Sequence, residues 1–125
     1  MKKILQRTVL LATLFLVCCG TRAFAQSDYY ARQAESHMRE AEYYEKKASG
    51  YDCEAEYYNK KAQSNLREAE YYTRQNKADK VRLYTRWSKD HTEKARMYMR
   101  WAQEARDKAA MRLRWAQEAM EKARR

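Results

Sequence analysis

The feature that most constrains the fold of this chain is a fourteen-residue repeat. Pairs of adjacent tyrosines recur at this spacing in the first half of the chain, and single tryptophans recur at it in the second half. The pairs are Tyr29-Tyr30, Tyr43-Tyr44, Tyr57-Tyr58 and Tyr71-Tyr72, and the tryptophans are Trp87, Trp101 and Trp115. Fourteen residues equal two heptads, after which a slightly supercoiled helix presents the same face to a partner. The repeat therefore predicts long α-helices that pack through one face.

The composition beyond residue 25 agrees with uninterrupted helix. This part of the chain contains no proline and one glycine, Gly50, and it is dominated by Ala, Glu, Lys, Arg and Gln, which are good helix formers. A helix could end at Gly50 through a left-handed cap. The seven-residue spacing from Ala48 to Ala55 nevertheless runs through this point in phase. We therefore expect a local weak point within a continuous helix.

Rows of alanines define the expected packing seam. In the first half, alanines follow one another at intervals of seven residues: Ala34, Ala41, Ala48, Ala55, Ala62 and Ala69. If they occupy heptad position a, position d holds Tyr30, His37, Tyr44, Tyr51, Tyr58, Asn65 and Tyr72. The second half has its own row, Ala95, Ala102, Ala109, Ala116 and Ala123. Alanine lets helix axes approach to the near end of the usual range of about 8–10 Å, and tyrosine rings can cover the sides of that contact.

The two alanine rows are out of phase, which indicates a break between them. The interval from Ala69 to Ala95 is not a multiple of seven. The aromatic marker also shifts, because Tyr72 and Trp87 stand one residue further apart than the repeat requires. Both shifts fall within residues 73–86, so we expect a turn, kink or skip in this segment.

The distribution of charge suits a hairpin. Residues 26–75 carry 8 basic and 10 acidic side chains, whereas residues 76–125 carry 15 basic and 7 acidic ones. We therefore predict an all-α fold in one domain, residues 26–125, with antiparallel arms at about 28–74 and 79–124. The alternative is one continuous long helix, because the break segment contains neither glycine nor proline.

Residues 1–25 have the parts of a cleaved signal peptide. A short basic start is followed by an apolar run from Val9 to Cys19 and by small residues at Ala23 and Ala25. The run is too short to cross a hydrocarbon core of roughly 30 Å, so we expect no transmembrane span after cleavage. Cleavage after Ala25 would export the chain to the periplasm or the outer surface. The alternative is a lipoprotein that is lipidated at Cys19.

The tyrosines extend beyond a two-helix seam, which favours self-association. The first tyrosine of each pair lies at heptad position c, about 160° from position a. Either further helices pack on these rings, or the rings form an exposed face. A two-arm hairpin has little core, and small cores give marginal stability. We therefore expect a homo-oligomer that is a non-catalytic structural or interaction protein, such as a scaffold or assembly subunit of the cell envelope.

The basic second half supports an alternative hypothesis, the binding of anionic polymers. Arginine and tryptophan stand side by side at the spacing of two heptads, as Arg86-Trp87, Arg100-Trp101 and Arg114-Trp115. Aromatic rings can stack on sugars or bases while arginines hold anionic groups. For an exported chain the candidates are lipopolysaccharide, anionic wall polymer and extracellular DNA. A third hypothesis, binding to a membrane surface, is disfavoured because bulky apolar side chains are few.

The sequence contains no convincing catalytic or metal-binding constellation. His37 and His91 are far apart, and there is no HExxH pattern, phosphate-binding glycine loop or nucleophile elbow. We expect no enzyme activity, no cofactor, no metal and no small-molecule substrate. After cleavage one cysteine remains, Cys53, which is a candidate for a disulfide between two chains.

Overall fold

The computed structural model describes residues 24–125 as two helices, α2 (Phe24–Arg74) and α3 (Ala78–Arg124). No strand occurs in this part of the chain. The all-α helical hairpin is thereby confirmed, and the single continuous helix is wrong. Residues 1–23, which include Cys19 and most of the expected signal peptide, lie outside the described residues.

The turn that follows α2 contains one residue with a left-handed backbone conformation, Asn76. The amide of Asn76 donates to the carbonyl of Thr73 at 3.1 Å, and the amide of Lys77 donates to the carbonyl of Tyr72 at 3.1 Å. This pattern is a Schellman cap, which needs a positive φ at its central residue. Asn76 supplies it with a φ of 56°, because asparagine tolerates this region better than other non-glycine residues. The chain therefore turns within the segment where the heptad phase breaks, without any glycine.

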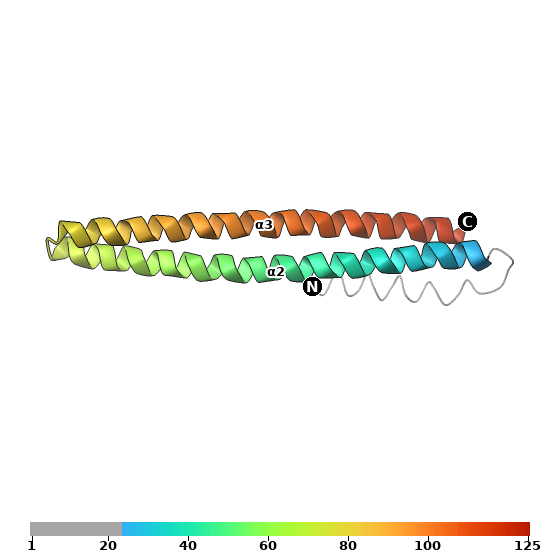
Figure 1. Ribbon diagram of the computed structural model, residues 1–125, viewed down its shortest axis with the longest axis horizontal. Helices are drawn as coiled ribbons and strands as arrows, with labels where there is room; N and C mark the ends of the chain where they lie inside the picture. Colours follow the sequence, from blue (N-terminus) through green and yellow to red (C-terminus); the bar gives the residue numbers. More distant parts are fainter. Residues whose placement is uncertain (1–23) are drawn as a thin grey trace. The chain divides into compact units, whose positions relative to one another are not determined.

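The contacts divide the described chain into two units. The turn unit comprises residues 44–107, and the terminal unit comprises residues 24–43 together with 108–125. In the turn unit, the second part of α2 and the first part of α3 lie side by side and antiparallel (Figure 1). None of the described helices is apolar over a stretch long enough to cross a membrane.

Small residues form the core of the turn unit. Its buried side chains are Ala48, Ala55, Ala62 and Ala69 on α2 and Ser88, Ala95, Ala102 and Ala105 on α3. Ser88 stands seven residues before Ala95 and therefore extends the α3 row toward the turn. The pattern of alanines alone does not identify Ser88 as a member of this row. Its hydroxyl donates to the carbonyl of Ala62 at 2.9 Å. This contact with the backbone of the opposite helix shows how closely the two helices approach, and it fixes their register.

The terminal unit has a core of the same kind. Its buried side chains are Ala31, Ala34 and Ala41 on α2 and Ala109, Ala116, Ala119 and Met120 on α3. Ala34, Ala119 and Met120 form its hydrophobic cluster. Among residues 24–125, no large side chain is fully buried. The cores are therefore narrow rows of small residues, and the larger rings stand beside them.

Candidate functional site

The inner tyrosines of the turn unit stack across the two helices. Tyr72 of α2 stacks on Tyr84 of α3, with 5.4 Å between ring centroids and 17° between ring planes. Tyr58 stacks on Tyr98, with 5.7 Å between centroids and 7° between planes. All four residues are half-buried. These pairs close one side of the small-residue seam, and aromatic pairs of this geometry stabilise beyond the area that they bury.

A polar pair lies between the two aromatic layers. Asn65 Nδ2 and His91 Nδ1 are 2.8 Å apart, and the tautomer of the ring decides which of them donates. The His91 ring also stacks on Tyr58, with centroids 5.9 Å apart. His91 therefore has a packing role, in which a hydrogen bond between the helices satisfies one ring nitrogen.

The tryptophans of the turn unit cover the flank of the seam. Trp87 contacts Tyr84 edge to face, with ring centroids 5.2 Å apart. The ring centroid of Trp101 lies 5.6 Å from that of Tyr51 and 5.3 Å from that of Tyr98. Trp87 is nevertheless 42% exposed and Trp101 is 38% exposed. Each indole thus has one side against the hairpin and one side open to solvent.

Trp115 in the terminal unit has different neighbours. Its ring meets His37 edge to face at 5.6 Å, and the guanidinium of Arg112 lies 4.7 Å from its ring centroid. Arg112 also forms an ion pair with Glu40 across the two helices, at 2.8 Å. The Nδ1 atom of His37 and the Nε atom of Arg112 are buried without a hydrogen-bond partner. This cluster pairs arginine with an aromatic ring and a carboxylate at once.

The outer tyrosines, at heptad position c, form a regular exposed row. Three of them stand edge to face against their inner neighbours, with ring centroids 5.4 Å apart for Tyr29-Tyr30, 5.2 Å for Tyr57-Tyr58 and 5.1 Å for Tyr71-Tyr72. In the turn unit Tyr57 and Tyr71 are each 50% exposed. The Tyr57 side chain raises the pKa of the Lys61 amine, whose nitrogen lies 4.7 Å from the Tyr57 ring centroid.

Three lysines of α3 lie over inner tyrosines of α2. The distances from nitrogen to ring centroid are 4.7 Å for Lys80 on Tyr72, 5.2 Å for Lys94 on Tyr58 and 5.7 Å for Lys122 on Tyr30. The aromatic repeat did not reveal these lysines. Their signal is the alternation of lysine and tryptophan every seven residues along α3, because each tryptophan follows a lysine by seven. Cation–π contacts of this kind are favourable at partly exposed sites.

The candidate polyanion contacts are exposed. Arg86, Arg100 and Arg114 form no ion pair with any residue of 24–125, and all three are exposed next to their tryptophans. Arg106 behaves differently because it pairs with Asp52 across the helices of the turn unit. The hydrogen bond to Asp52 raises the pKa of Arg106. The basic half thus has both arginines that pair with the acidic half and arginines that remain open to a ligand.

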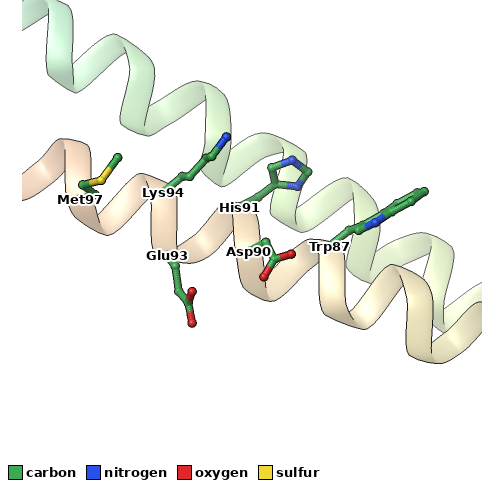
Figure 2. Close-up of a pocket in the computed structure, with 6 residues that line it drawn as sticks. All are labelled: Trp87, Asp90, His91, Glu93, Lys94 and Met97. Carbon is green, nitrogen blue, oxygen red and sulfur yellow. The ribbon is translucent and has the colours of Figure 1, made fainter.

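A shallow hollow of about 590 Å³ lies along α3 in the turn unit. Its lining residues are Trp87, Asp90, His91, Glu93, Lys94 and Met97. Figure 2 shows His91 directed toward α2 and Glu93 directed away from it. Within the described chain, no group of three or more His, Cys, Asp or Glu side chains is placed to hold a metal ion. The hollow is therefore a mixed surface of aromatic, apolar and charged groups.

The remaining expected residues are divided between the seam and the surface. Ala123, the last alanine of the expected α3 row, is only half-buried. The other expected seam alanines are buried, and none of them is more than 6% exposed: Ala34, Ala41, Ala48, Ala55, Ala62, Ala69, Ala95, Ala102, Ala109 and Ala116. The inner tyrosines Tyr30, Tyr44, Tyr58 and Tyr72 are half-buried. Cys53 is an exposed free thiol on α2. Comparison of the chain with protein-family models, with curated proteins and with solved structures finds no match.

Proposed function

We propose that this chain is an exported, non-catalytic helical-hairpin protein that self-associates, as a scaffold or assembly subunit of the cell envelope. The observation that carries the proposal is the contrast between its core and its surface. The core contains alanine, serine and one methionine, whereas tyrosines and tryptophans at regular spacing remain 38–58% exposed. Exposed aromatic side chains that recur at regular spacing mark a candidate association site, as exposed apolar patches do on other proteins.

Sedimentation of residues 26–125 in low and high salt, with circular dichroism, tests this function. We expect a helical dimer or larger assembly in both salts, because apolar burial is insensitive to screening. A helical monomer at roughly 100 µM, where weak specific complexes are already populated, would contradict the proposal.

Export rests on residues 1–25 and has its own test. Expression of the full chain in a Gram-negative host, followed by mass spectrometry of the product, should give a mature N-terminus at Gln26. A lipid on Cys19 would instead indicate a lipoprotein, and an intact signal segment in the cytoplasm would contradict export.

A second candidate function is the binding of anionic polymers. The exposed and unpaired Arg86, Arg100 and Arg114 favour it, since each stands beside a partly exposed tryptophan. Retention on heparin should then weaken steeply as salt rises. Replacement of the three arginines by glutamine should abolish that retention while sedimentation stays unchanged. Absence of retention at low salt would eliminate this function.

A further inference from the structure

We propose that one flank of the turn unit is the docking surface for a second copy of this chain. The proposal rests on self-association and names the surface that mediates it. We call this surface the aromatic flank. Its aromatic members are Tyr57 and Tyr71 of α2 and Trp87 and Trp101 of α3, each 38–50% exposed.

The outer tyrosines of α2 and the lysines and tryptophans of α3 lie on the same side of the turn unit, because they contact the same inner tyrosines or share a heptad position with residues that do. Lys94 of α3 lies over the ring of Tyr58, and Tyr57 of α2 meets the same ring edge to face. Lys80 and Tyr71 meet at Tyr72 in the same way. Trp87 and Trp101 share the heptad position of these lysines, because they stand seven residues after them. The outer tyrosines, the lysines and the tryptophans therefore line one flank of the hairpin.

Bulky and small residues alternate along the α2 side of this flank. On α2, Ser64 stands midway between Tyr57 and Tyr71, and Gly50 stands seven residues before Tyr57. A methyl group added at Gly50 would meet nothing within 4 Å, so the space beside it is open. Gly50 and Ser64 therefore each leave a gap, here called a notch, at the heptad position that Tyr57 and Tyr71 fill with rings, here called ridges.

Such a surface is complementary to a copy of itself. The ridges repeat every second heptad, and the notches lie one heptad from each ridge. A second hairpin can therefore place its rings into the notches of the first, as knobs enter holes in helical bundles. Symmetric association through the same patch on both copies is also the commonest form of oligomer.

The charge of the aromatic flank favours a second copy over a polyanion. Arg86 and Arg100 stand at heptad position f and border the flank. The flank itself, heptad positions c and g of both helices, carries four lysines and four acidic residues, all exposed: Lys47, Lys61, Lys80, Lys94, Glu54, Glu68, Asp90 and Glu104. Its net charge is zero, whereas the turn unit as a whole has 15 basic and 11 acidic side chains and a net charge of +4. A neutral surface with alternating signs can pair with itself, while polyanion binding requires an excess of positive charge.

Two changes to the aromatic flank test the proposal by sedimentation of residues 26–125. The double variant Tyr57→Ser/Tyr71→Ser removes two ridges and places at both positions the residue that Ser64 already provides. The variant Ser64→Tyr fills a notch and adds aromatic surface. We expect the double variant to raise the dissociation constant of the assembly by roughly tenfold or more, because central aromatic contacts are lost. We expect Ser64→Tyr to raise it by a similar factor, because the added ring occupies the space that a ring of the second copy would fill.

Matched controls lie on other faces. Leu66→Ser/Met99→Gln removes exposed apolar side chains from the opposite flank, and Gln63→Tyr adds a ring beside position 64 but outside the notch. Both should leave association within about threefold of the original. Non-specific hydrophobic association would be weakened equally by the first control and strengthened by Ser64→Tyr, so that result would overturn the proposal. Circular dichroism verifies that every variant remains helical.

The outcomes separate this inference from the proposed function. If the original chain associates and neither flank variant weakens it, the docking surface is elsewhere and self-association stands. If the original chain is monomeric, or associates only when heparin is added, both the surface and the self-association are refuted.

Discussion

The turn unit and the terminal unit have the same kind of residue at heptad position a and different kinds of residue at heptad position d. In both, heptad position a holds buried small residues on each helix. At position d of the turn unit, α3 supplies the rings of Tyr84, His91 and Tyr98, which meet side chains of α2 in stacked or hydrogen-bonded layers. Further along α3 the same position holds Ala105 and, in the terminal unit, Arg112 and Ala119.

The difference indicates that the row of small residues sets how closely the helices approach, whichever side chains fill the neighbouring row. Once small residues allow close approach, the neighbouring row can be filled in two ways. The turn unit uses ring against ring, while the terminal unit uses alanine and an arginine that pairs with Glu40. We therefore expect the two units to respond alike to changes in the first row and differently to changes in the second.

Enlarging an alanine of the shared row should have the largest effect. Ala48 in the turn unit and Ala41 in the terminal unit are both almost completely buried. Leucine at either position has no space, so each variant should lose about 1–3 kcal/mol of unfolding free energy, or more. Urea unfolding followed by circular dichroism measures this loss. Ala110→Leu, at an exposed position of α3, is the control and should change stability little. Equal stability of all three variants would contradict the close approach.

Removing an inner tyrosine should affect the turn unit more than the terminal unit. Tyr58 contacts Tyr98, His91 and Lys94, whereas the aromatic and cation contacts of Tyr30 are Tyr29 and Lys122. Both rings are half-buried, so Tyr58→Ala should cost about 2 kcal/mol and Tyr30→Ala about 1 kcal/mol. Thermal and urea unfolding of the two variants compare these costs. A larger loss at Tyr30 would reverse the comparison.

Breaking the polar layer should cost less than removing Tyr58, and a second substitution should restore most of the stability. Asn65→Ala leaves the ring nitrogen of His91 without its partner, at a cost of about 1–1.5 kcal/mol. The double variant Asn65→Leu/His91→Leu removes both polar groups and should regain most of that stability. Together with the original chain and the single leucine variants, it forms a double-mutant cycle measured by urea unfolding. Additive losses would show that the 2.8 Å hydrogen bond contributes nothing.

The cross-helix ion pairs should give the smallest effects. The side chains of Arg112 and Glu40 are 27% and 43% exposed, whereas those of Arg106 and Asp52 are 41% and 46% exposed. Less exposure means less screening, so Arg112→Met should cost up to about 1 kcal/mol and Arg106→Met about half of that. Unfolding at low and high salt checks both values. A stronger dependence on salt at Arg112 than at Arg106 would contradict this order.

The heptad repeat by itself predicted the helices and their packing rows. The phase break and the distribution of charge favoured a hairpin over one continuous helix, and the structure decided between the two. Alanines at intervals of seven must lie on one helical face, because the backbone geometry of a helix is local. The phase break between Ala69 and Ala95 located the turn within residues 73–86 for the same reason. The choice of Asn76 as its left-handed residue was not apparent, because asparagine is also common in helices and loops that keep a negative φ.

Only the tertiary structure decided how the rows of the two helices pair. The hydroxyl of Ser88 donates to the backbone of Ala62, and the sequence does not reveal that these two residues pair. The pairing of Asn65 with His91, and of Arg112 with Glu40, depends on the same register. Register between helices is set by the length of the turn and by contacts between residues far apart in the chain. A local repeat can therefore determine which face packs, while the partner of each side chain on that face follows only from the folded hairpin.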